Sequence, residues 1–228
     1  MTSQSIYNGE LNAIFDEDSR YTPRPAIGWW LASDHDQFMD YVEKERSEGR
    51  HVFSLACDDD LGFGVFTLEG VGTDQGVTWD SDMSSVQEWL DEGYRITACG
   101  ARNSRFYYVM TRGAMEYEGK SQTCITRSTW GEAVQFIEEM YKEGERITGI
   151  CYSTGLEKYL VIMTESSESG QCSMWGNEGI SEWMAEQYSK RHDPTIIFTD
   201  PRSQKNLVVM TSDNDRSGYR KLHITLRK

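Results

Sequence analysis

The sequence lacks the features that would place it at a membrane or on nucleic acid. No apolar run approaches the roughly 20 residues that a membrane-spanning helix needs, and Met1–Ser5 shows neither the basic region nor the apolar region of a signal peptide. Basic residues are scarce: 23 Lys and Arg stand against 37 Asp and Glu, which gives a net charge of -14. DNA, RNA and anionic membranes all need a basic face. We therefore expect no nucleic-acid or membrane partner, and a cytoplasmic or nuclear location.

Motifs for metal binding and catalysis are missing as well. The five cysteines include no pair separated by only two residues, and the four histidines stand singly without metal-ligand spacing. No G-x-S-x-G nucleophile elbow is present. Asp213–Gly218 begins like a calcium-binding loop, but Ile224 stands where an EF-hand has its bidentate Glu. We therefore predict no catalytic residue, no cofactor and no metal, and we interpret the cysteines as small strand hydrophobes in a reducing compartment.

What the sequence does contain is a repeat. Its 38% hydrophobic and 12% aromatic content is typical of a folded globular chain. The stretch Val86–Gly113 predicts a short amphipathic helix, a glycine, a strand, a polar turn and a second strand. Similar stretches recur before and after it at intervals of about 50 residues, which indicates a repeat architecture.

The repeat predicts four units with the same order of elements. Helices are expected to begin near Asp34, Ser84, Thr129 and Ile180, each followed by three strands, and the first three to end at Gly49, Gly93 and Gly144. Met110, Met163 and Met210 stand at matching places in the strands. The sequence thus divides into a lead-in with a partial unit and four full units: 1–33, 34–82, 83–128, 129–179 and 180–228.

The residues of the repeat also resemble a known region. Trp89, Gly93–Thr97 and Val109–Thr111 form the pattern of a Trp, then Gly-Tyr-x-Ile-Thr, then Val-Met-Thr, and the third unit repeats it with Gly144–Thr148 and Ile162–Thr164. This pattern resembles the repeat region that follows the kinase domain in plant casein-kinase-I-like protein kinases, over most of residues 26–228. The sequence contains no kinase Gly-rich loop, His-Arg-Asp or Asp-Phe-Gly. The resemblance implies a regulatory or docking role and supplies no catalytic residue.

These observations together predict an α+β fold. A unit of one helix and a three-stranded antiparallel sheet cannot bury both faces alone, so neighbouring units must stack. We expect an α/β propeller-like ring of four full units and one partial unit, in a single pseudo-symmetric repeat domain. Its competitors are an open α+β arrangement and two domains that divide near Thr129.

The candidate site residues are aromatic and acidic. Most of the seven tryptophans are expected to fix helices to sheets, since aromatic side chains bury large areas. The alternative is that some line a shared face where acidic loops attract a cationic partner. Asp58–Asp60 has two interpretations, a solvated turn or part of a divalent-cation site. A Cys–His pair made by His51 with Cys57 or Cys99 is a further, less favoured hypothesis. The candidate interaction residues are Trp29, Trp30, Trp79, Trp175, Asp58, Asp59 and Asp60.

Two classes of function follow from the sequence. The first is a non-catalytic, soluble intracellular module that docks a protein partner with a basic surface. The second is a small-molecule-binding protein, or an enzyme without cofactor, whose site lies where the repeats converge. The resemblance and the missing catalytic motifs favour the first class.

Overall fold

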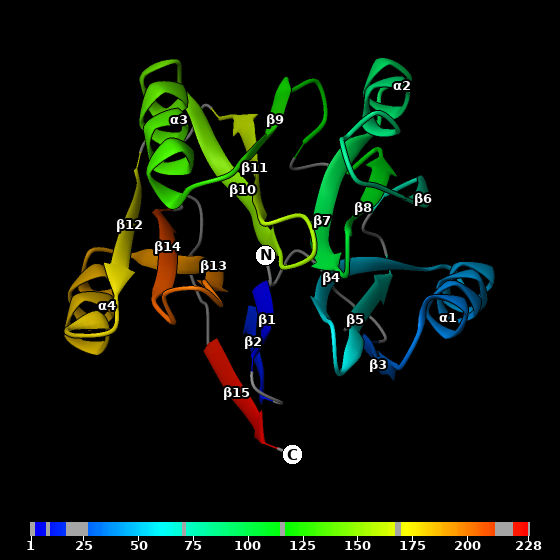
Figure 1. The fold of residues 1–228 in the computed structure, drawn as a ribbon, viewed down its shortest axis with the longest axis horizontal. Coiled ribbons are helices and arrows are strands. Elements are labelled where there is room, and N and C mark those ends of the chain that lie inside the picture. Colours follow the sequence, from blue (N-terminus) through cyan, green and yellow to red (C-terminus); the bar gives the residue numbers. More distant parts are fainter. Residues whose placement is uncertain are drawn as a thin grey trace.

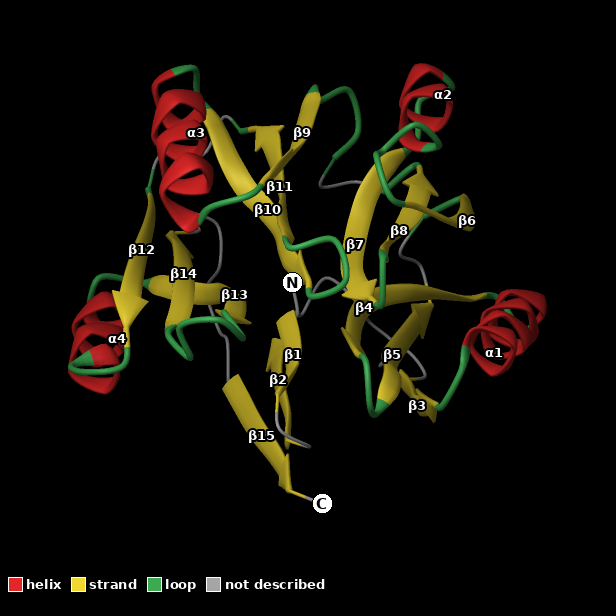
Figure 2. Ribbon diagram, in the orientation of Figure 1, coloured by secondary structure: helices red, strands yellow, loops and turns green. Residues whose placement is uncertain are grey.

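The computed structural model describes residues 3–7, 10–16, 27–69, 72–114, 117–166, 170–212 and 221–227. Of residues 3–7, 10–16, 27–29, 193 and 221–227 only the backbone is described. The calcium-loop-like stretch Asp213–Gly218 lies outside these residues. The fold is α+β, built from repeated units of a three-stranded antiparallel sheet and a helix (Figures 1 and 2).

In the described part of the chain, four helices alternate with groups of strands. The helices are α1 (His35–Ser47), α2 (Val86–Asp91), α3 (Trp130–Lys142) and α4 (Ile180–Ser189). The strands up to α2 are β1 (Ser3–Tyr7), β2 (Glu10–Asp16), β3 (Ile27–Ala32), β4 (Arg50–Asp58), β5 (Gly62–Glu69) and β6 (Asp74–Asp80). The strands between α2 and α4 are β7 (Arg95–Arg102), β8 (Arg105–Arg112), β9 (Gln122–Arg127), β10 (Glu145–Ser153), β11 (Lys158–Glu165) and β12 (Gln171–Gly176). The last strands are β13 (His192–Thr199), β14 (Asn206–Ser212) and β15 (Lys221–Arg227).

Each helix begins and ends where its sequence predicts. Asp34 caps α1 by accepting a hydrogen bond from the Gln37 N–H, and Thr129 forms a capping box with Glu132 at the start of α3. After α1, α2 and α3 the chain turns through a glycine with positive φ, at Gly49 (78°), Gly93 (88°) and Gly144 (87°). The predicted helix starts are therefore confirmed. Side-chain capping accounts for the starts of α1 and α3, whereas neither Ser85 before α2 nor Gly179 before α4 makes a side-chain cap.

The sheets group the strands differently from the units read along the sequence. In each of four sheets, the strand before a helix and the first strand after that helix lie on either side of the second strand after it. The four strand orders are β3-β5-β4, β6-β8-β7, β9-β11-β10 and β12-β14-β13. The third strand of each predicted unit therefore belongs to the next sheet. The third strand of the last unit, β15, pairs with β2 in a fifth sheet, β1-β2-β15.

Three names are used below for the positions within a sheet. The outer strands are β3, β6, β9, β12 and β15; the middle strands are β5, β8, β11, β14 and β2; the inner strands are β4, β7, β10, β13 and β1. Figure 1 shows the inner strands near the centre of the molecule and the four helices at its periphery. Inner strands β4, β7, β10 and β13 contact one another in this order, and β1 contacts both β4 and β13. Strand pairing between the described residues stays within each sheet.

The core lies between successive units. One cluster joins Phe38 and Val42 of α1 to Tyr107 and Val109 on the middle strand of the following sheet. Two further clusters join α2 to the sheet of β11 and α3 to the sheet of β14 in the same way. Three of the five sheets thus cover the helix of the unit before them, which explains why the units must stack to be stable.

The three methionines predicted to be equivalent are equivalent in the structure. Each lies on a middle strand, opposite the inner-strand residue where the pairing register shifts, and each is fully buried: Met110 opposite Ile96, Met163 opposite Ile147, Met210 opposite Pro194. Their common register confirms the sequence alignment of the units. No helix in the described part of the chain is long and apolar enough to cross a membrane.

Candidate functional site

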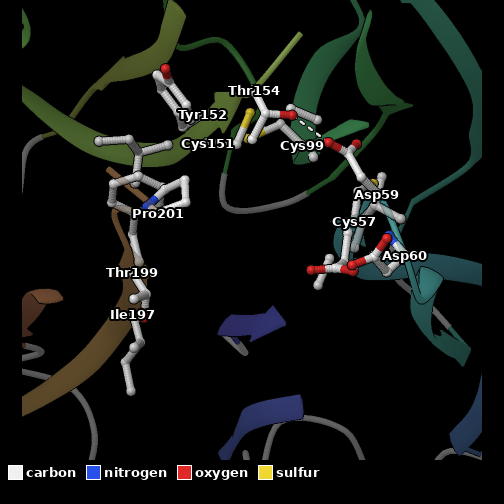
Figure 3. A pocket seen from close by; sticks show the side chains of 17 residues that line it. Cys57, Asp59, Asp60, Cys99, Cys151, Tyr152, Thr154, Ile197, Thr199 and Pro201 are labelled. Atoms are coloured by element: carbon white, nitrogen blue, oxygen red, sulfur yellow. Dashed lines mark hydrogen bonds between the residues drawn. The ribbon is translucent and has the colours of Figure 1, made fainter. Parts of the chain in front are cut away.

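A cavity of about 360 Å³ opens where the inner strands of four units converge (Figure 3). Its wall is formed by the same three positions of each inner strand: Leu55–Cys57, Cys99–Ala101, Ile150–Tyr152 and Ile197–Thr199. Asp58, Asp59, Asp60, Thr154 and Pro201 complete the described lining. The cavity therefore combines apolar and thiol groups with a group of carboxylates on one side.

Asp58 and Asp59 have structural tasks at this cavity. Asp58 Oδ1 accepts hydrogen bonds from the backbone N–H groups of Asp60 and Leu61, each at 2.9 Å, which fixes the turn between β4 and β5. Asp59 accepts from the Asn103 N–H with Oδ1 and from the Thr154 hydroxyl with Oδ2, as the dashed line in Figure 3 shows for Thr154. One carboxylate thus joins the hairpin turns of three units. Asp60 is exposed.

Three thiols from three units line the same cavity. Cys57 and Cys99 lie on neighbouring inner strands, and Cys151 lies on the next one. Burial raises the pKa of the Cys57 and Cys151 thiols well above its ordinary value. A protonated thiol is a poor nucleophile and a poor metal ligand. Cys57 and Cys151 therefore supply polarisable packing surface rather than activated nucleophiles.

The Cys–His pair considered from the sequence has no support in the geometry. His51 and Cys57 lie near opposite ends of β4, about 20 Å apart along the strand. Burial lowers the pKa of His51, and the charged groups that affect it are Asp74 and Arg46. Cys57 instead lies beside Cys99. Within the described residues, no group of three or more His, Cys, Asp or Glu side chains could hold a metal ion.

The candidate tryptophans do not meet in one place. Trp79 on β6 contacts His35 of α1 with ring centroids 4.4 Å apart, and Trp175 on β12 stacks on Trp130 of α3 at 4.0 Å. Both are half-buried and pack an outer strand against the helix of the preceding unit. Trp30 is 44% exposed and stacks on Tyr41 of α1 at 5.4 Å. The structure describes only the backbone of Trp29.

Acidic side chains are concentrated on the exposed faces of the peripheral helices. Exposed acidic residues outnumber exposed basic residues within the four helices. The acidic ones are Asp36, Asp40 and Glu43 on α1, Glu88 and Asp91 on α2, Glu132, Glu138 and Glu139 on α3, and Glu182 and Glu186 on α4. The periphery of the molecule therefore presents repeated negative charge.

The residues that form the wall of the cavity were not predicted together from the sequence, although their spacing from the helix-ending turns could have identified them. The wall positions are the sixth to eighth residues after the turn that ends each helix, which is at Gly49, Gly93, Gly144 or Arg191. Arg191 takes positive φ (62°) where the other turns have glycine. Alignment of the units on these turns would have brought Cys57, Cys99 and Cys151 into one region.

Comparison with known proteins gives no assignment: neither a protein-family model nor a curated protein matches the chain.

Proposed function

We propose that the chain is a non-catalytic docking module, acting in the cytoplasm or nucleus, that binds a protein partner with a basic surface. The observation that carries this proposal is the acidic exposed face repeated on α1, α2, α3 and α4. Complementary charge steers association and selects partners. The raised pKa values of the Cys57 and Cys151 thiols and the structural use of Asp58 and Asp59 agree with a binding role. So does the resemblance to an accessory region of plant kinases.

Affinity capture with a charge-reversed variant tests this proposal. The variant carries Asp36→Lys, Asp40→Lys and Glu43→Lys on α1, and quantitative mass spectrometry compares the proteins that it retains with those of the parent chain. A matched control has the same change of net charge at exposed loop positions: Glu118→Lys, Glu157→Lys and Glu178→Lys.

The expected result is one or more basic proteins that the parent and the control retain and the α1 variant loses. Their purified forms should then bind the parent with an affinity that falls steeply as salt increases, because exposed charges are screened. Equal capture by the parent and the α1 variant would overturn the proposal for this helix, and equal loss in the control would show that only net charge matters.

The proposed architecture is a propeller-like ring closed by the fifth sheet, which makes the four full units and the partial unit one domain. Two contacts of β1, with β4 and with β13, support it, because they link the first and fourth units through the sheet that β15 completes. Removal of residues 221–228 should then destabilise all four units together, as one cooperative transition at lower denaturant. Unchanged unfolding would favour an open row.

A small-molecule-binding protein remains the second candidate, favoured by the cavity between the inner strands. Native mass spectrometry of the purified chain after incubation with a metabolite extract would detect such a ligand. Ile197→Trp, which places a larger side chain in the cavity wall, should abolish the binding of a ligand that occupies this cavity.

A further inference from the structure

The cavity between the inner strands has charge of one sign only in its described lining. Asp58, Asp59 and Asp60 line it, whereas Lys, Arg and His are all absent from the described lining residues. An anionic ligand would meet charge of its own sign there, and a cationic ligand would meet the opposite sign. The composition of the cavity therefore favours a cation.

Two of the three carboxylates keep oxygens that can accept further hydrogen bonds. Asp59 uses both of its oxygens, in the bonds from Asn103 and Thr154. Asp58 accepts the two N–H groups of its turn with Oδ1 only. The Asp60 carboxylate makes no hydrogen bond or ion pair with another described residue. Since a carboxylate has about four acceptor positions, Asp58 Oδ2 and both oxygens of Asp60 can bind a donor.

A basic side chain beside this turn does not pair with these oxygens. The guanidinium group of Arg102 donates to the backbone carbonyls of Ser33 at 2.9 Å and of Asp59 at 3.5 Å, and it lies over the Phe63 ring at 5.1 Å. It forms no ion pair with a carboxylate among the described residues. Within the described chain the Asp58 and Asp60 carboxylates are therefore not neutralised by a salt bridge.

The other side of the cavity is uncharged. Figure 3 shows Ile197 and Pro201 across the cavity from Asp60. Ile150 and Cys151 continue this wall, and the Cys151 thiol is neutral because burial raises its pKa. Such a wall is suited to an apolar group, as in most small-molecule sites. One cavity thus has a carboxylate side and an apolar side.

The volume of the cavity limits the size of a ligand. It measures about 360 Å³, and a water-sized group occupies about 30 Å³, so a ligand of about a dozen non-hydrogen atoms would fill it. Asp59 and Asp60 are exposed, which places the carboxylate side at the mouth of the cavity. A charged group bound there would stay partly hydrated and would avoid the full cost of burial.

We propose that the cavity binds a small organic monocation, an ammonium group joined to an apolar body, of about a dozen non-hydrogen atoms in all. The ammonium group donates to Asp58 and Asp60, and the apolar body packs against Ile197 and Cys151. A polyamine fits less well, because its second charge would lie against the neutral wall. The inference rests on the second candidate of the proposed function, a small-molecule-binding protein, for which it names the class of ligand.

Three probes with one indole body and different charge test this class. Tryptamine carries an ammonium group, tryptophol replaces that group with a neutral hydroxyl, and indole-3-acetate carries a carboxylate. Isothermal titration calorimetry of the full chain at neutral pH measures each affinity. We expect tryptamine to bind at a single site and tryptophol to bind at least about tenfold more weakly, because hydrogen bonds to charged groups are stronger than neutral ones. Indole-3-acetate should show no binding.

Variants of the carboxylates then locate the ammonium group. Asp58→Asn combined with Asp60→Asn removes both charges and retains Oδ1 of residue 58 for the two N–H groups of the turn. It should weaken the binding of tryptamine at least about tenfold and leave that of tryptophol unchanged. Glu118→Gln combined with Glu178→Gln, at exposed loop positions, changes the net charge equally and should leave both affinities unchanged. Thermal melts establish that each variant is folded.

A variant of the apolar wall locates the rest of the ligand. Ile197→Trp reduces the space in the cavity and should abolish the binding of both tryptamine and tryptophol. Tryptamine that binds this folded variant as tightly as the parent chain would lie outside the cavity, and the inference would be wrong.

The inference is also overturned if tryptamine does not bind, if it binds no more tightly than tryptophol, or if the double Asn variant retains the parent affinity. Tighter binding of spermidine than of tryptamine would overturn the assigned class, since the cavity would then select for several charges. These outcomes are separate from the docking function. If the cavity binds none of the probes while charge reversal on α1 still removes captured proteins, the ligand site fails and the docking proposal stands.

Discussion

Gln122 on β9 hydrogen-bonds to both backbone groups of Ile96 on β7, the inner strand of the preceding sheet. Its Oε1 accepts from the Ile96 N–H at 2.7 Å, and its Nε2 donates to the Ile96 carbonyl at 3.1 Å. Ile96 lies where the β7–β8 register shifts. At such a bulge one strand leaves backbone groups without a ladder partner, and here a side chain of the next unit supplies it.

The same contact recurs between other units. Gln75 binds both backbone groups of Val52, and Gln171 binds both backbone groups of Ile147. Each glutamine also donates to a threonine of its own middle strand: Thr111 for Gln75, Thr164 for Gln122, Thr211 for Gln171. The fourth bulge has Pro194, whose nitrogen carries no hydrogen, so the full contact cannot form there. We call these three contacts the glutamine clamps.

Loss of a glutamine clamp should destabilise the fold. Gln122→Ala leaves the Ile96 N–H and C=O without this partner, and the expected loss is about 2–3 kcal/mol of unfolding free energy. Urea unfolding measures it. Gln135→Ala is the matched control, because Gln135 is exposed on α3 and its side chain donates to Glu139 of its own helix. This variant should cost less than about 0.5 kcal/mol. Equal losses in the two variants would contradict a specific role for the clamp.

The clamps show which part of the fold the sequence could predict. Capping residues and helix-ending glycines act locally, so the starts of α1 and α3 could be placed from Asp34 and Thr129, and the ends of α1, α2 and α3 from the glycines that follow them. Neither α2 nor α4 has a side-chain cap, and their starts were placed from the spacing of the repeat. Strand partners are non-local. The pattern of Gly76–Trp79 predicts a strand but does not say that it pairs in the following sheet. The contact of Gln122 with Ile96 could not be predicted from the sequence either, because an isolated glutamine is usually a surface residue.

The candidate site shows the same limit. Asp58 and Asp59 were chosen because consecutive carboxylates suggest binding, and the structure shows that their oxygens are used in turns and between units. Cys57 and Cys99 were interpreted separately as strand hydrophobes. Their convergence at the cavity depends on how units stack, and one sequence without an alignment does not contain that information directly.

Trp89 should contribute more to stability than Trp183. The sequence predicts about 3–5 kcal/mol for either residue on replacement by alanine. In the structure the Trp89 ring lies on Gly76 of β6, so closely that a Cβ there would clash with it, and it meets Tyr94 edge-on at 4.7 Å. Trp183 is half-buried and belongs to none of the three described core clusters. We expect about 3 kcal/mol for Trp89→Ala and about half of that for Trp183→Ala.

Thermal and urea unfolding of the two tryptophan variants, with capture of partners in parallel, tests this order. Lost binding at an unchanged melting temperature would instead assign the tryptophan to a recognition surface. Gly76→Ala provides a second test from the opposite side of the contact, and it should also destabilise, because its new Cβ meets the Trp89 ring.

The thiols of Cys57 and Cys151 should resist alkylation in the folded chain. Burial raises the pKa of both well above the usual value, so little thiolate exists near neutral pH. Iodoacetamide labelling at pH 7.5 followed by peptide mass spectrometry measures each site. Cys57 and Cys172 are both half-buried, but burial raises the pKa of Cys172 less than that of Cys57, so Cys172 should react faster. All thiols should react at similar rates in urea. Rapid labelling of Cys57 in the native chain would show an activated thiol and would favour a catalytic or redox role for the cavity.

Glu45 should make the stability of the first unit depend on acid pH. Its buried carboxylate accepts from Arg50 at 2.6 and 2.8 Å and from the Thr67 hydroxyl at 2.6 Å, and these bonds, first those of Arg50, lower its pKa. A lowered pKa in the folded state means that the stabilisation is complete above the ordinary glutamate value of 4.5. It then declines as pH falls and disappears below the folded-state pKa. Glu45→Gln should cost about 1–2 kcal/mol at pH 7, since solvent partly screens the pair. It should also flatten the fall in stability as the pH drops below 4.5. The exposed Glu43→Gln on the same helix is the control. Parallel profiles for the parent and Glu45→Gln would show that another carboxylate is responsible for the acid dependence.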